Sequence, residues 1–184
     1  MKKNMQKYFR FLIVLFVACT GCESDDICDA GTPTTPKVII EFYNFNSQAL
    51  IKNVTNLSII GSGMTQGLIL SPGATIDNDK YFFNGSKIGV PLKIDQDATT
   101  YNFILNAKTP ATPITDVVKF SYKRVNEYVS RACGYRTFFD FSVSAVAITI
   151  NNVPNATSGF WIKDVQILKQ TIRDETTTHI KIFI

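Results

Sequence analysis

From Lys37 to the end of the chain, apolar and polar residues alternate in one short segment after another. A period of two is typical of a β-strand, whose successive side chains point to opposite faces of a sheet. The alternating or apolar segments are 38–43, 57–60, 68–70, 87–94, 101–106, 118–123, 138–143, 146–150, 161–172 and 180–184. No segment shows a convincing amphipathic-helix pattern. The pattern predicts an all-β fold, an antiparallel β-sandwich of roughly nine or ten strands, with a β-barrel as the alternative.

Three segments carry more specific expectations. Pro91 cannot donate to a sheet, so the strand within 87–94 is expected at an edge or with a bulge. Segments 87–94 and 101–106 flank a polar turn and are expected to pair as a hairpin. Segment 161–172 is expected to be one bent strand, and 180–184 is expected to be built into a sheet.

The first 22 residues follow a different order. Lys2, Lys3, Lys7 and Arg10 precede an apolar run, Phe11–Ala18, and Cys19-Thr20-Gly21-Cys22 follows it. The run has 8 residues, whereas a helix that spans a bilayer needs roughly 20. Basic residues, then apolar residues, then small residues are the order of a signal peptide. The order ending in a cysteine resembles the signal peptide and lipobox of bacterial lipoproteins.

This resemblance implies that residues 1–21 are a signal peptide and that Cys22 is lipidated. Cys19 is the other cysteine available, but small Thr20 and Gly21 stand directly before Cys22. The lipobox implies a diacylglycerol on the sulfur and an acyl chain such as palmitate on the amino group. Each buried methylene contributes about 0.8 kcal/mol, so several chains hold a protein stably at a membrane without a spanning helix.

A tether and one domain are expected after Cys22. Residues 22–36 contain an acidic cluster, Glu23–Asp26, and two prolines that favour extended backbone. The single β-domain is expected over 37–184. The acidic cluster resembles the surface-export signal of Bacteroidota lipoproteins, with a plain solvated linker as the alternative. The expected location is the outer membrane, either facing the periplasm or on the cell surface.

Removal of residues 1–21 changes the charge and the cysteine count. Four of the 19 basic residues leave with that segment, so 15 remain against 15 acidic residues and the net charge is zero. Nucleic-acid binding needs a concentrated basic surface, so no nucleic-acid partner is expected. Cys28 and Cys133 remain beside the lipidated Cys22. In an oxidising compartment they are expected to form a disulfide, with two buried free thiols as the alternative.

One cluster of arginines and tyrosines surrounds Cys133. These residue types are favoured at recognition surfaces, so the cluster is a possible ligand or partner patch. The alternative is a plain connection between strands that Cys133 holds in place. The patch consists of Arg124, Tyr128, Arg131, Tyr135 and Arg136.

No catalytic, metal or cofactor site is predicted. Gly61-Ser62-Gly63 is not followed by a helix, so it is read as a hairpin loop and not as a phosphate loop. Asp77-Asn78-Asp79 lacks the glycine and the terminal glutamate of a calcium loop. The single histidine, His179, is read as a surface residue because a zinc site needs more ligands.

Several segments together resemble a group of uncharacterised flavobacterial lipoproteins. They are Cys22–Asp29, Val38–Tyr43, Arg131–Tyr135 and His179–Phe183. The resemblance implies a membrane-anchored envelope protein and transfers no catalytic residue. The expected role is non-catalytic binding or scaffolding, with an envelope protein or a glycan as partner. The alternative is a hydrolase acting on glycans, in which Asp95 or Asp97 would converge with a second carboxylate.

Overall fold

A computed structural model describes residues 27–32, 34–109, 112–154 and 159–184. These residues form thirteen strands in three sheets and one short 3₁₀ helix, η2 (Asp77–Tyr81). The chain divides into a larger unit, Pro33–Glu127 with Arg136–Ile184, and a smaller unit, Met1–Thr32 with Tyr128–Tyr135. No helix among the described residues is long and apolar enough to cross a membrane. Residues 1–21 and Cys22 lie outside the described residues.

The first sheet has six strands and is antiparallel throughout. Its longest pairing joins β5 to β6, from Ala98↔Ser121 to Leu105↔Ile114. The strands in spatial order are β10 (Val153–Pro154), β9 (Ile148–Ile150), β6 (Ile114–Ser121), β5 (Ala98–Leu105), β2 (Val54–Gly61) and β3 (Phe83–Gly85).

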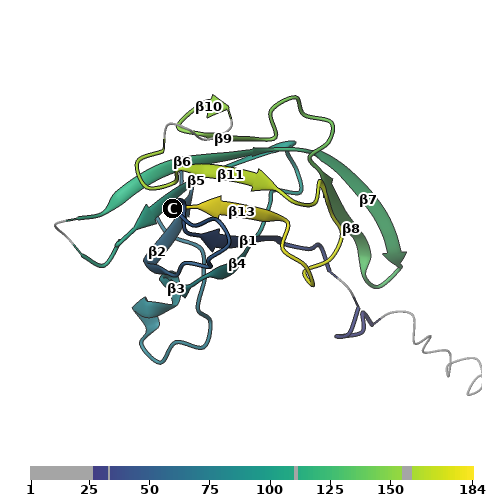
Figure 1. Cartoon of the computed structure of the whole chain (residues 1–184). Helices are drawn as coiled ribbons and strands as arrows, with labels where there is room; N and C mark the ends of the chain where they lie inside the picture. Colours follow the sequence, from purple (N-terminus) through teal and green to yellow (C-terminus); the bar gives the residue numbers. More distant parts are fainter. Residues whose placement is uncertain (1–26, 33, 110–111, 155–158) are drawn as a thin grey trace, which may run out of the picture. The chain divides into compact units, whose positions relative to one another are not determined.

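The second sheet has four strands, in the order β11 (Asp164–Ile167), β13 (Ile180–Phe183), β1 (Val38–Tyr43) and β4 (Lys87–Val90). The C-terminal strand β13 lies between β11 and β1, which confirms that the end of the chain is built into a sheet (Figure 1). It pairs in parallel with β1, with Ile40 beside Ile180. Strand β4 is at an edge and ends before Pro91, as the missing N–H requires.

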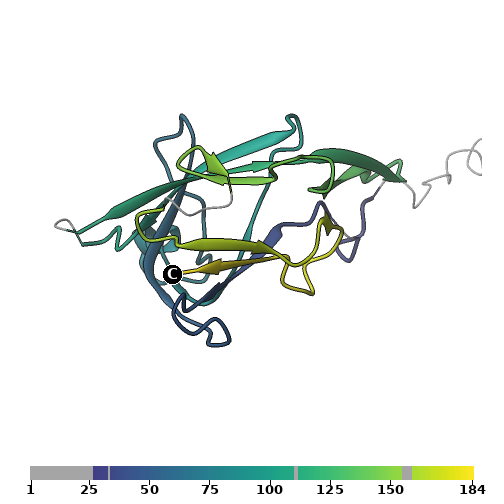
Figure 2. The same cartoon turned by 45° about the horizontal axis from the view of Figure 1, so that its top comes forward.

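These two sheets face each other as the layers of a β-sandwich (Figure 2). Inward side chains from both sheets form one core, because alternate residues of each strand point to the same face. Full burial of a side chain of this size stabilises the fold by about 1.5–3 kcal/mol. The largest fully buried side chains include Ile40 and Phe42 of β1, Phe103 of β5 and Phe120 of β6.

A third sheet has the order β12 (Thr171–Ile172), β8 (Gly134–Asp140) and β7 (Lys123–Ser130). Only Tyr122 separates β7 from β6, so one stretch of chain passes from the first sheet into the third. Phe139 and Phe141 contribute to the common core from this side. The thirteen strands exceed the nine or ten expected because several of them are only two to four residues long.

Two expectations about the strands are wrong, one about which strands pair and one about a segment expected to be a single strand. Strand β4 pairs with β1, whereas β5 pairs with β2 and β6, so segments 87–94 and 101–106 form no hairpin. The connection after Pro91 instead crosses from one sheet to the other. Segment 161–172 is likewise two strands in different sheets, β11 beside β13 and β12 beside β8.

Two smaller expectations also fail. Residues 68–70 form no strand, although the N–H of Leu68 donates to the carbonyl of Ile59. A turn follows them, in which the N–H of Ala74 donates to the carbonyl of Ser71. The contact between Leu68 and Ile59 is therefore not extended into a strand pairing. Val143 alternates with the polar residues of segment 138–143 and is expected to be buried. Its side chain is 56% exposed, because β8 ends at Asp140.

Candidate functional site

The predicted patch is divided between the two units. Arg124 of β7 and Arg136 of β8 belong to the larger unit. Tyr128, Arg131 and Tyr135 belong to the smaller unit.

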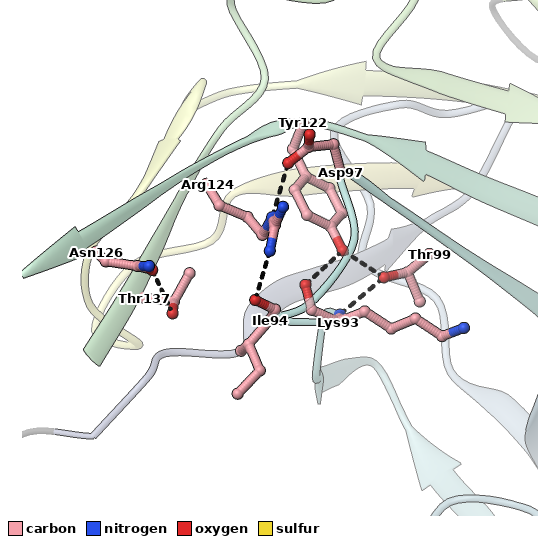
Figure 3. A network of polar contacts seen from close by, with 8 residues as sticks. All are labelled: Lys93, Ile94, Asp97, Thr99, Tyr122, Arg124, Asn126 and Thr137. Carbon is pink, nitrogen blue, oxygen red and sulfur yellow. Dashed lines mark hydrogen bonds and ion pairs between the residues drawn. The ribbon is translucent and has the colours of Figure 1, made fainter. Parts of the chain in front are cut away.

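The Arg124 guanidinium forms hydrogen bonds with a turn of the larger unit. Its Nε donates to the Asp97 carboxylate at 2.7 Å, and its Nη1 donates to the carbonyl of Ile94 at 2.8 Å (Figure 3). The hydrogen bond that Arg124 donates to Asp97 raises the pKa of Arg124 above its ordinary value. Arg124 therefore closes the turn after β4, and Asp97 is its partner.

A buried hydroxyl network holds the same turn from inside. The Tyr122 hydroxyl donates to the carbonyl of Lys93 at 2.8 Å and lies 2.6 Å from the Thr99 hydroxyl (Figure 3). Thr99 also accepts the N–H of Lys93 at 2.8 Å. Since a carbonyl only accepts, the proton of Tyr122 points to Lys93 and Thr99 donates to Tyr122. Burial raises the pKa of Tyr122, which keeps its hydroxyl protonated.

Arg136 is also engaged within the larger unit. It forms an ion pair with Glu127, and its guanidinium lies 4.7 Å from the centroid of the Phe138 ring. Arg173, after β12, lies 4.8 Å from the same ring. Two cations over one aromatic ring stabilise this part of the third sheet through cation–π attraction.

The smaller unit contains a disulfide between Cys28 and Cys133, with an S–S distance of 2.00 Å. The N–H of Cys133 donates to the Ser130 hydroxyl, and Gly134 follows with a φ of +68° that favours glycine. The rings of Tyr128 and Tyr135 pack edge to face, 5.4 Å apart. Both tyrosines are more than half exposed, so this unit presents an aromatic pair beside its disulfide.

Asp116 of β6 is a fully buried carboxylate that the sequence reasoning missed. Its Oδ1 accepts from the Asn151 side chain at 2.8 Å and from the N–H of Phe160 at 2.7 Å. Its Oδ2 accepts from the N–H groups of Trp161 and Ile162, each at 2.9 Å. One side chain therefore fixes the entire 160–162 loop. Its position in the strand is the signal in the sequence. Asp116 precedes the inward-facing Val118 and Phe120 by two and four residues, so its side chain points to the same buried face.

A cleft of about 220 Å³ lies beside this loop. Trp161 lines it and donates its indole N–H to the carbonyl of Phe103 at 3.2 Å. The remaining lining residues lie at or directly next to the start of β2, the end of β5 and the end of β13: Lys52, Asn53, Val54, Thr55, Leu105, Asn106 and Ile184. None of them belongs to the predicted patch.

His179 corrects the prediction of a surface residue, since it is only 1% exposed. His179 lies against β1: its N–H donates to the carbonyl of Ile39 at 2.9 Å, and the N–H of Ile39 donates to His179 Nδ1 at 3.0 Å. The opposite nitrogen, Nε2, is buried without a partner among the described residues. Burial lowers the pKa of His179 below its ordinary value, so the ring is neutral.

Three of the four carboxylates considered for chemistry have cationic partners. Asp77 and Asp79, on η2, form ion pairs with Lys80 and Lys108. Asp97 is bound to Arg124. Over the described ranges of the chain, no three His, Cys, Asp or Glu side chains are placed to hold a metal ion.

A comparison with protein families finds a match over most of the chain. The model described as "Family of unknown function (DUF6452)" matches residues 57–184. Among curated proteins and among solved structures, no match to the chain is found. The matched region runs from β2 to β13, and it contains Asp116, Cys133 and Trp161.

Proposed function

We propose that this chain, which belongs to the DUF6452 family of unknown function, is a lipid-anchored protein of the cell envelope whose β-domain binds a ligand or partner without catalysis. Its mature form starts at Cys22 and is held at the outer membrane by the lipid. Residues 22–36 are the tether. The domain faces either the periplasm or the cell exterior, and Glu23–Asp26 favours the exterior.

The Cys28–Cys133 disulfide is the observation that carries this proposal. Disulfides persist in oxidising compartments such as the bacterial periplasm and the cell surface, and they are rare in the cytosol. Cys28 follows the predicted lipidation site by only six residues. The predicted lipidation site and the disulfide are both consistent with the proposed location outside the cytoplasm.

The geometry of the larger unit supports binding. Its cleft has fixed walls, because Asp116 holds the loop that carries Trp161. Small-molecule sites are usually concave, largely preformed and lined by apolar groups with a few polar ones. The glycan hydrolase remains an alternative prediction. Asp97, one of its two candidate carboxylates, has Arg124 as its partner.

Mass spectrometry of the full chain, expressed in a bacterium that processes lipoproteins, tests the anchor. The expected result is a mature protein that begins at Cys22 and carries acyl chains. A Cys22→Ser variant is the matched control and should remain unprocessed. Detection of an unmodified Met1 on the wild-type protein would exclude the lipid anchor.

Protease treatment of intact cells tests the side of the membrane. Loss of the protein from intact cells is expected if Glu23–Asp26 directs export to the surface. A variant with Ala at positions 23, 25 and 26 should then be protected in intact cells and cleaved in permeabilised ones. Protection of the wild-type protein in intact cells would place the domain in the periplasm.

A further inference from the structure

The smaller unit presents a pair of aromatic rings to its surroundings. Tyr128 is 55% exposed and Tyr135 is 70% exposed, although the two rings pack edge to face. Ile27, at the start of the described part of the same unit, is 81% exposed. A tyrosine ring has an apolar body and a polar hydroxyl, which suits a surface with an apolar side and a wet side.

The disulfide ties this aromatic pair to the start of the predicted mature chain. Cys133 stands two residues before Tyr135 and is bonded to Cys28, with the two Cα atoms 4.9 Å apart. Cys28 is six positions after Cys22, and an extended chain covers at most about 3.6 Å per residue, so about 22 Å is the upper limit between them. A lipid on Cys22 therefore keeps the pair close to the membrane surface, whatever path the tether takes.

The residue types of the pair fit the boundary between lipid and water. Tyrosine is enriched at this boundary in membrane proteins, because its ring enters the head-group level while its hydroxyl stays hydrated. A tethered contact also needs little affinity of its own. A short linker supplies an effective concentration on the order of millimolar, so that even a weak contact is populated.

Charge adds no attraction to the contact. Asp29 and Arg131 are the two charged side chains among the described residues of the smaller unit, and both are exposed. Their charges cancel, and an anionic membrane would repel the acidic cluster Glu23–Asp26. The surface is thus suited to zwitterionic head groups, and a contact made by aromatic rings should persist in high salt.

We propose that Tyr128 and Tyr135 lie in the head-group region of the membrane that holds Cys22. The occupant of this surface is a bilayer of zwitterionic lipid. The inference rests on the proposed lipid anchor, and it gives the smaller unit a second, non-covalent contact with the same membrane. The Cys28–Cys133 disulfide is what brings the pair within reach.

Tryptophan probes test the contact in the anchored protein. The lipidated protein, with its disulfide intact, is reconstituted into phosphatidylcholine vesicles whose acyl chains are either ordinary or brominated near the head group, since bromine quenches nearby tryptophan. Tyr128→Trp and Tyr135→Trp each add one probe to Trp161, which is 6% exposed and common to all variants. Both should lose more emission than the wild type in brominated vesicles. The loss should remain in about 1 M salt, where the screening length is about 3 Å.

Ile76→Trp is the matched control. Ile76 is 63% exposed and lies directly before η2 in the larger unit. This variant should be quenched no more than the wild type, and circular dichroism verifies that all variants are folded. Equal quenching of the three variants would mean general adsorption of the protein and would overturn the proposal. The proposal is also overturned if Tyr128→Trp and Tyr135→Trp stay unquenched by lipid and open to acrylamide, which would leave the pair free for a soluble partner.

Mass spectrometry of the same preparation distinguishes this contact from the anchor. A lipidated Cys22 without quenching overturns the contact and retains the anchor. An unlipidated Cys22 refutes the anchor, and with it the contact that depends on it.

Discussion

Asp116 and Trp161 are 45 residues apart in the chain and are joined by a buried hydrogen bond of 2.9 Å, from the Trp161 N–H to Asp116 Oδ2. The same carboxylate also holds the residues on either side of Trp161. A strand of the core thus determines where the only tryptophan lies, and with it one wall of the cleft.

Replacement of Asp116 by Asn should destabilise the domain, although the side chain keeps its shape. Both carboxylate oxygens accept two hydrogen bonds each, so an amide NH₂ in either orientation faces two donors. Each buried donor left unpaired costs about 1–3 kcal/mol, and the expected loss is therefore about 2 kcal/mol or more. Urea denaturation followed by Trp161 fluorescence measures it. Asp95→Asn, at an exposed turn position, should leave stability nearly unchanged.

Replacement of Gly159 by Ala should destabilise the same loop by a different mechanism. A Cβ at this position would overlap the carbonyl oxygen of Ile162 and lie 3.1 Å from Asp116 Oδ2. The loop has to move away from Asp116, and overpacking of this kind costs about 1–3 kcal/mol. Gly73→Ala is the matched control, because a Cβ at that position would have no atom within 4 Å. Equal melting temperatures for the two variants would contradict the tight packing at Gly159.

Protonation of His179 should destabilise the fold as the pH falls. Burial holds the folded-state pKa below the ordinary value of 6.5, so at lower pH the unfolded chain takes up a proton that the folded one resists. The contribution of His179 is thus fully present above pH 6.5 and decreases below it. Asp174 and Glu175 oppose this shift, whereas Lys169 and Lys87 add to it. A proton on Nδ1 would also remove the acceptor for the Ile39 N–H.

Melting temperatures measured between about pH 5 and pH 8 test this linkage. His179→Gln supplies an amide oxygen as acceptor and does not titrate in this range. The difference between the wild type and His179→Gln should therefore be constant above pH 6.5 and should shift in favour of the variant below it. Parallel pH profiles for the two proteins would show that His179 does not titrate with folding.

Alternation is sufficient to predict β1, β5 and β13, because each buries one face of a regular strand. It cannot predict which strands pair. Strands β1 and β13 lie side by side although about 140 residues separate Ile40 from Ile180, whereas the adjacent β4 and β5 lie in different sheets. The spacing of apolar residues within one segment does not determine which distant segment it pairs with.

The surroundings of His179 and Arg124 were also beyond what the sequence could predict. His179 is in the polar phase of the last strand, but it lies against Ile39 of β1, to which two hydrogen bonds join it, and it is buried there. The residue type of Arg124 favours recognition, whereas its contacts are with Asp97 and Ile94. Residue type and strand phase do not report what a neighbouring segment brings against a side chain.

Removal of the Tyr122 hydroxyl should cost more stability than removal of the Arg124 guanidinium, although both hold the same turn. Tyr122→Phe leaves the buried Thr99 hydroxyl and the Lys93 carbonyl short of a partner, at a cost of about 1–2 kcal/mol. The Arg124–Asp97 pair lies at the surface, with the two side chains 29% and 66% exposed, and surface pairs contribute up to about 1 kcal/mol. Urea denaturation of Tyr122→Phe and Arg124→Ala should give this order. The reverse order would place the main support of the turn at the surface.

Reduction of the Cys28–Cys133 disulfide should lower the free energy of unfolding, because the unfolded chain is then less restricted. The bond closes a loop between residues 105 positions apart. In the chain-entropy model, a loop of this size contributes up to about 4.7 kcal/mol, because it restricts the unfolded ensemble. Denaturation with and without reductant measures the contribution in the wild type. The double variant Cys28→Ser with Cys133→Ser is the control and should not respond to reductant. A wild type that also fails to respond would mean that the two thiols are free in the purified protein, and the argument for an oxidising compartment would lose its basis.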